Sequence, residues 1–488
     1  MYDIIVIGND VSALVAASFA VHLGARTLLV YDGKTSASVS IPGGYRFDGD
    51  PLPWTGLDGS GVFSKLLREL HIEGANEKQE PTRLQVMLES RTVEFSPGIR
   101  ERCNDTARDF FLDHDEIRRY FTLIEDDARF IRDMVQFILG GPVSLRGRIA
   151  ALLSERSRRL AGQARRKISG LPALGASRDL FNSLDAECSL FSRYDYYGLA
   201  DARSSYCMYS SLCGSFGISP GEKDSILETL RNKTEESGGI IVRPDRIDTV
   251  ALGDGIFIEA TTEGSCERIE GRRLIISTKW PGFPVIVQND EGLSDWYEGH
   301  FIPRCRSVRP FTLHLGVDDR SIPENMGEHL VMLRDNDGRS DSLPFFYLQA
   351  GPTGPSTSAP EGGRALSVTA FLPPSPRGPD DAELASTADA MLDVLKQAFP
   401  FLYEGIDSMD RDLSISRFIR ALQAPALDHV MKERPLLGLP IYAGDTPRAN
   451  VFITGGELAP LLGFDGDIVS GINAAQRACG ETQYVYYP

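Results

Sequence analysis

The chain has 488 residues, enough for two or three domains, and a composition typical of a globular protein with a sizeable core. Its net charge of −17 argues against nucleic acid as a partner, because the field of the whole protein repels phosphates. No apolar run is long enough to span a bilayer and no basic leader precedes one, so we expect a cytoplasmic protein. The seven cysteines lack CxxC spacing, and we predict no metal site.

Residues 2–20, YDIIVIGNDVSALVAASFA, predict a strand, a tight turn and a helix of small residues, the start of a dinucleotide-binding unit. Such a turn normally carries three glycines, whereas this chain has Gly8, Asp10 and Ala13. Gly8 still permits the sharp turn, and Ala13 still lets the helix pack on the strand. Asp10 is the exception, because its Cβ blocks close approach and its carboxylate would face the negative charge of a diphosphate. We therefore expect a bound diphosphate to be displaced away from Asp10. Val11 and Ser12 open a helix whose N-terminal amides attract an anion.

The second strand is predicted within RTLLVYDG, residues 26–33, and should end in an acid that bonds the ribose hydroxyls. By spacing from Gly24, that position falls on Tyr31. Asp32 occupies this position only if the end of the strand is shifted by one residue. This segment predicts a Rossmann-type unit and leaves open whether the unit holds a nucleotide.

Two segments in the middle of the chain have an unusual composition. Residues 146–167 are strongly basic, with apolar residues at helical spacing, and predict an amphipathic helix. This helix either docks on an anionic membrane surface as a peripheral contact or forms a solvated face paired with nearby carboxylates. Residues 191–212 contain five tyrosines, which either line a pocket for a hydrophobic substrate or pack in the core.

Six further segments follow the order found in one enzyme family. They are GYRFDGDPLPWTGLDGSGVFSKLLRELHIE (44–73), SILETLRNKTEESGGIIVRPDRIDTV (225–250), RRLIISTKWPGFP (272–284), two strand-rich stretches (311–338 and 344–374) and NVFITGGELAPLLGFDGDIVSGINAAQRA (450–478). Together with the opening unit, they resemble the phytoene desaturase-like branch of the FAD-dependent amine oxidase superfamily. The resemblance covers about two-thirds of the chain.

This resemblance implies an α/β fold with a discontinuous Rossmann-type FAD-binding domain and a second, helix-capped substrate domain built on a mixed sheet. The FAD-binding domain would comprise residues 1–75, 220–290 and 445–488, and the substrate domain residues 76–219 and 291–444. The implied function is an FAD-dependent oxidoreductase that transfers two electrons, as a hydride, between the flavin and a hydrophobic small molecule. The oligomeric state stays open.

The resemblance also implies which residues hold FAD. Ile247 lies in the segment that binds the adenine end, Glu457 lies by the ribityl–diphosphate region, and Gly466 opens a helix that faces the flavin pyrimidine. With the opening turn and the second strand, the predicted cofactor residues are Gly8, Asp10, Val11, Ser12, Ala13, Asp32, Ile247, Gly455, Gly456, Glu457, Gly466, Asp467 and Ile468. No catalytic side chain is predicted, because the isoalloxazine itself accepts the hydride. We expect His314, Glu328 and His329 to be structural.

The sequence also departs from the family pattern at the cofactor site. The GGR-x-x-T loop beneath the flavin is missing, and Asp467 stands where a small alanine is usual. These departures keep a second function open: a cofactor-free relative that binds a protein or lipid partner, as the Rab GDP dissociation inhibitors do with this fold.

Overall fold

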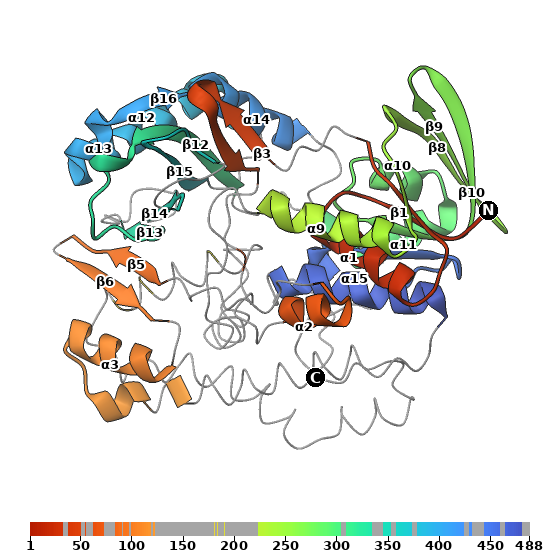
Figure 1. Ribbon diagram of the computed structural model, residues 1–488, viewed down its shortest axis with the longest axis horizontal. Coiled ribbons are helices and arrows are strands. Elements are labelled where there is room, and N and C mark those ends of the chain that lie inside the picture. The colour runs from red at the N-terminus through yellow and green to blue at the C-terminus, as the bar shows by residue number, and fades with distance from the viewer. Residues whose placement is uncertain are drawn as a thin grey trace.

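The computed structural model describes residues 1–32, 38–49, 54, 62–72, 83–89, 91–96, 99–118, 121–122, 180, 183, 190, 223–303, 309–333, 345–352, 358–372, 378–423, 429–431, 444–458 and 464–480. Within them, two large sheets lie side by side, each with its own helices (Figure 1). The predicted α/β class with a second, mixed sheet is confirmed.

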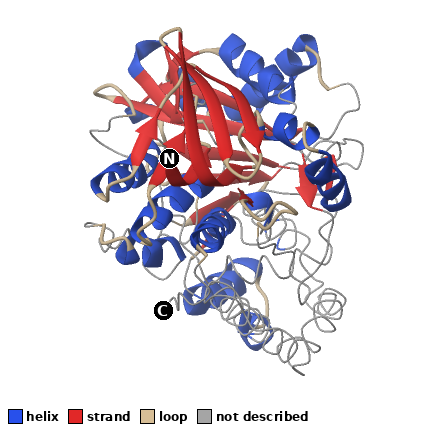
Figure 2. Ribbon diagram, turned by 90° about the vertical axis from the view of Figure 1, so that its right-hand side faces the viewer, coloured by secondary structure: helices blue, strands red, loops and turns tan. Residues whose placement is uncertain are grey.

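The first sheet is assembled from three distant parts of the chain. Its strands are β1 (Tyr2–Ile7), β2 (Thr27–Val30), β7 (Ile240–Val242), β8 (Arg246–Leu252), β9 (Ile256–Thr262), β10 (Ser265–Ser277) and β18 (Val451–Thr454). The order is β7-β2-β1-β10-β9-β8, and β18 also pairs with β10. β7, β2, β1, the second half of β10 and β18 run parallel, while β8 and β9 are antiparallel to their neighbours. Figure 2 shows the strands near the N-terminus lying side by side.

Alternate side chains of β1 enter two different cores. Ile4 and Val6 pack with the helices on one face, and Ile5 and Ile7 pack on the other, as the period-two geometry of a strand requires. The first face carries α1 (Val11–His22), α9 (Lys223–Glu236) and α15 (Phe464–Cys479). The second carries α10 (Phe283–Gln288) and α11 (Glu291–His300), followed by β11 (Phe301–Pro303), which pairs with β17 (His429–Met431).

α1 and α15 lie unusually close to each other. A Cβ placed on Gly471 of α15 would be 2.6 Å from the carbonyl oxygen of Ser12 and 2.9 Å from the Cβ of Val15. Only glycine permits this approach. The packing brings the first turns of the two helices to the same edge of the sheet.

The second sheet has the order β16-β12-β15-β14-β13-β5-β6. These strands are β5 (Leu84–Met87), β6 (Thr92–Phe95), β12 (Arg309–Asp318), β13 (His329–Leu333), β14 (Phe345–Ala350), β15 (Gly363–Leu372) and β16 (Ile406–Met409). An apolar core joins it to α12 (Asp381–Ala398), α13 (Pro400–Glu404) and α14 (Arg411–Gln423). The remaining elements are the hairpin β3 (Ser38–Ile41) and β4 (Tyr45–Asp48), α2 (Val62–Glu69) and α3 (Ile99–Phe110).

The two sheets share one apolar core. Val331, Phe345 and Tyr347 of the second sheet belong to the same buried cluster as α1 and α15. The predicted domain boundaries stay a prediction, because several lie next to residues outside the described ranges.

Candidate functional site: the carboxyl edge of the first sheet

The candidate site lies where the parallel strands β1, β2, β10 and β18 end. Four short segments follow those ends: Gly8–Asp10, Tyr31–Asp32, Ser277–Lys279 and Gly455–Glu457. In open α/β sheets, ligands bind at this edge. The fold therefore brings together most of the predicted cofactor residues.

Gly8 makes the close approach between β1, α1 and β10 possible. Its φ is +141°, and a Cβ there would lie 2.7 Å from the Cβ of Ser277 and 2.9 Å from the Cβ of Ala13. A larger residue at position 8 would push α1 away from the sheet.

Asp10 is the N-cap residue of α1, and donors of the chain itself hold its carboxylate. Its Oδ1 accepts hydrogen bonds from the amide of Ser12, at 3.0 Å, and from the hydroxyl of Ser12, at 2.5 Å. Its Oδ2 accepts a hydrogen bond from the hydroxyl of Ser277. Our expectation that this carboxylate would face the charge of a diphosphate is therefore incomplete, because the chain's own donors already satisfy it.

The first turn of α1 keeps donors available beside this cap. Val11 and Ala13 are buried, and in the described ranges their amides have no acceptor. Buried amides without acceptors are rare in folded proteins. An anion at the helix N-terminus would satisfy them.

The end of β2 carries an aromatic ring between two cations. Tyr31 is buried, and the guanidinium carbons of Arg231 and Arg243 lie 5.6 and 5.5 Å from its ring centroid. Burial raises the pKa of Tyr31, which keeps its hydroxyl protonated at neutral pH. Asp32 follows, partly exposed, and is the nearest acid in sequence for a ribose.

Glu457 is held in a rigid, buried turn after β18. Its Oε2 accepts a hydrogen bond from the Thr278 hydroxyl at 2.8 Å. Gly455 has φ +156°, and a Cβ on it would lie 1.9 Å from Oγ1 of Thr278 and 2.5 Å from Oε2 of Glu457. Its amide donates to the hydroxyl of Ser470 at 3.1 Å, which ties the turn to α15.

The first turn of α15 carries an ion pair that the sequence pattern does not predict. Asp467 is fully buried, and its Oδ1 lies 2.8 Å from Nζ of Lys279, whose side chain is 26% exposed. The Lys279 amide donates to Oγ of Ser277, which itself donates to Asp10. One signal in the sequence was available: Lys279 lies two residues after the end of strand β10, which is apolar near that end.

The other predicted residues lie in different surroundings. Gly466 and Ile468 are buried in the first turns of α15, and Gly456 is buried in the 3-10 turn Gly456–Leu458. Ile247 lies in β8, which is separated from β1 by β9 and β10. Its predicted place at the adenine end of FAD stays a prediction.

A second polar cluster lies between the two sheets. Nδ1 of His329 is 2.6 Å from the hydroxyl of Tyr347, and the Lys223 ammonium is 5.4 Å from the ring centroid of Trp54. The Trp54 ring in turn stacks on Phe464, the first residue of α15, with centroids 4.5 Å apart. The Lys223 charge also acts electrostatically on His329, so the cluster links the second sheet to the first turn of α15.

Burial lowers the pKa of both His329 and His314 to about 3. Both histidines are therefore uncharged in the folded protein between pH 6.5 and pH 3. In the unfolded chain they bind protons over this range, so the stability of the fold decreases as the pH falls. We predict that, between pH 6.5 and pH 5, the free energy of unfolding falls by about 1.5 kcal/mol less in His329→Gln than in the parent. Urea unfolding at the two pH values measures this, with exposed His114→Gln as the control. Equal pH dependence in the two variants would contradict the prediction.

The residues of this site fit FAD on the chemistry of their donors. The unpaired amides of Val11 and Ala13 suit the diphosphate, and the buried Glu457 carboxylate suits ribityl hydroxyls. Ser12 and Ser277 donate hydrogen bonds to the Asp10 carboxylate. These bonds stabilise its negative charge and weaken its repulsion of a phosphate.

No family model matches the sequence, and no curated protein matches it. Among solved structures, an oxidoreductase from Methanosarcina mazei is 15% identical, with a TM-score of 0.57 over 96% of this chain and 98% of that chain. Cyclohexylamine oxidase from Brevibacterium oxydans is 13% identical, with a TM-score of 0.52 over 98% and 99% of the two chains. A Rab GDI from Plasmodium falciparum is 10% identical, with a TM-score of 0.54 over 99% of both.

At these identities the likeness shows the fold alone. The chain has a fold that oxidoreductases and amine oxidases use, as the sequence predicted, and the phytoene desaturase-like branch stays a prediction. The same fold is found in the Rab GDI.

Two further sequence predictions concern segments in the middle of the chain. The basic segment 146–167 and the tyrosine-rich segment 191–212 fall outside the described residues. Within the described ranges, no helix combines the length and apolar composition needed to cross a bilayer.

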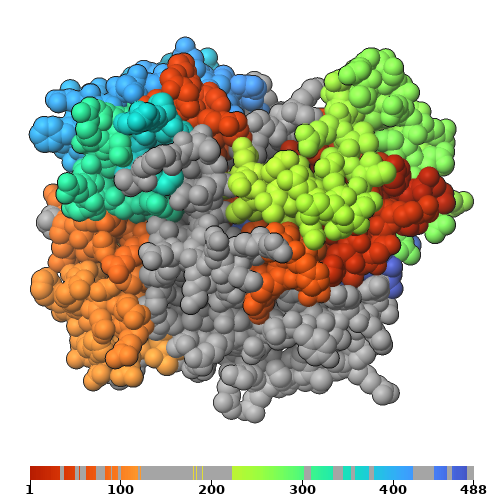
Figure 3. Space-filling model, in the orientation of Figure 1, coloured from red at the N-terminus to blue at the C-terminus, as the bar shows by residue number. Residues whose placement is uncertain are grey.

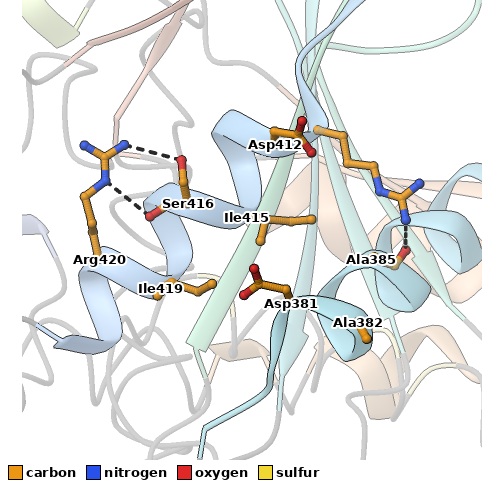
Figure 4. A pocket seen from close by; sticks show the side chains of 9 residues that line it. Asp381, Ala382, Ala385, Asp412, Ile415, Ser416, Ile419 and Arg420 are labelled. Carbon is orange, nitrogen blue, oxygen red and sulfur yellow. Dashed lines mark hydrogen bonds between the residues drawn. The ribbon is translucent and has the colours of Figure 1, made fainter.

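An open groove of about 890 Å³ lies between α12 and α14 (Figure 4). Ile415 and Ile419 are part of its lining, with Asp381, Asp412 and Arg420 around them. It shares no residue with the candidate site at the first sheet, and it belongs to the helices that cover the second sheet.

Proposed function

We propose that this protein is an FAD-dependent oxidoreductase that acts by hydride transfer on a hydrophobic small molecule, in the manner of phytoene desaturases. One observation carries the proposal: the first turns of α1 and α15 meet at the carboxyl edge of one sheet, with unpaired amides on α1 and the buried Glu457 beside them. Two helix N-termini and a carboxylate acceptor are the donors and acceptors that a flavin dinucleotide requires.

In this proposal the amides of Val11 and Ala13 hold the diphosphate, displaced from Asp10, and Glu457 accepts hydrogen bonds from the ribityl hydroxyls. The first turn of α15, from Gly466, faces the pyrimidine. When bound, the flavin supplies the two-electron acceptor. The apolar core between the sheets, including Trp54 and Phe464, keeps water from the space between them.

The test is the replacement of Gly466 by leucine. Gly466 is buried in the first turn of α15, so a branched side chain there would fill the space the proposal assigns to the flavin. We expect the variant to lose bound FAD while its circular dichroism stays that of the parent.

The matched control is Gly292→Leu, which changes a glycine in the first turn of α11, where a Cβ would lie 3.5 Å from Oδ1 of Asp290. The control should retain FAD. A folded Gly466→Leu protein with a full complement of FAD would contradict the proposed site.

A second function is favoured by a different observation. Tyr31 replaces the ribose-binding acid, and the Lys279–Asp467 ion pair lies at the N-terminus of α15. If Tyr31 and this ion pair prevent FAD from binding, the protein is a cofactor-free relative that binds a protein or lipid partner. Failure of the protein to take up added FAD would select this second function.

A further inference from the structure

Arg231 is tied to the turn that follows β1. It extends from α9, which packs on α1 and lies at the surface beside the N-terminal segment (Figure 3). Its Nη2 and Nε donate to Oδ1 of Asn9 at 2.6 and 3.2 Å. The guanidinium also lies against the ring of Tyr31, so it bridges the ends of β1 and β2.

Arg231 retains hydrogen-bonding capacity in this position. A guanidinium has five N–H groups. Two contact Asn9 and one contacts Oε2 of Glu228 at 2.8 Å, and the other two have no acceptor in the described part of the chain. The side chain is 12% exposed, whereas Glu228 is 52% exposed, so solvent screens the acid more than the base.

A diphosphate bound here would gain from a positive charge beside it. The Asp10 carboxylate lies in the turn that follows β1 and would repel a phosphate. A diphosphate displaced from Asp10 moves outward from the first turn of α1. Asn9, which fixes Arg231, is the residue directly before Asp10.

We propose that Arg231 is the cation that holds the FAD diphosphate. The inference rests on the proposed function, because it assumes that FAD occupies the site. Arg231 then offers its two remaining N–H groups to phosphate oxygens, and Tyr31 and Asn9 hold its plane in place.

Titration of FAD into flavin-free protein, followed by flavin fluorescence, tests this. Charge-assisted hydrogen bonds correspond to about a 10- to 100-fold change in affinity, so Arg231→Gln should raise the Kd for FAD by that factor. Arg231→Lys keeps the charge but not the planar guanidinium, so its Kd for FAD should lie between those of the parent and Arg231→Gln. Added salt should weaken FAD binding to the parent more than to Arg231→Gln.

Arg243→Gln is the control, because Arg243 lies against the same ring but is exposed and is not bonded to Asn9. It should change the Kd less than threefold, as an exposed charge does. If the parent binds FAD and Arg231→Gln binds it equally well, or if Arg243→Gln weakens it as much, the role of Arg231 is wrong and the proposed function stands. If the parent binds no FAD at any concentration, both are overturned.

Discussion

Replacing Lys279 with methionine should lower the free energy of unfolding by about 3 kcal/mol, because the fully buried Asp467 then loses its ion-pair partner. Removing the ammonium takes a positive charge away from a carboxylate that has no solvent exposure, and this costs more than the pair contributes. The double variant Lys279→Met/Asp467→Ala should regain most of this loss. Urea unfolding of the two single variants and the double variant measures the coupling.

The matched control is Arg26→Met, which breaks an exposed pair with Asp3. Solvent screens that pair, so the expected loss is below about 1 kcal/mol. If Lys279→Met is no less stable than Arg26→Met, the ion pair with Asp467 is not a structural element of the site.

Replacing Asp10 with glycine should have opposite effects on stability and on FAD affinity. The flavin-free variant should be less stable by about 1 to 2 kcal/mol, because the hydroxyls of Ser12 and Ser277 lose their acceptor. Its Kd for FAD should fall about tenfold, since a carboxylate near a partly solvated diphosphate costs on the order of 1 kcal/mol. Asp10→Asn, which keeps the shape without the charge, should show a similar gain in affinity. An unchanged or weaker affinity in both variants would show that the Asp10 charge does not oppose FAD.

The sequence predicted the first sheet well because its signals are local. The apolar run before Gly8 and the small residues after it can form little other than a strand, a turn and a buried helix. The order of later segments predicted that residues 450–478 return to this unit, and β18 pairs with β10 while α15 packs on α1.

The side-chain network of the site could not be predicted in the same way. Ser277, which donates to Asp10, and Lys279, which contacts Asp467, lie at or just after the end of β10, 267 and 188 positions away from those acids along the chain. The placement of Arg231 over Tyr31 depends on how α9 packs against α1. Ile247 was assigned to the adenine end by resemblance to a motif, and this assignment stays a prediction.

The visible absorption spectrum of the purified, untreated protein tests the central claim most directly. We expect the absorption bands of oxidised flavin, with about one FAD released per chain on denaturation. A colourless protein that takes up no added FAD, and gains none when Asp10 is replaced with glycine, would contradict the account and leave a fold without its cofactor.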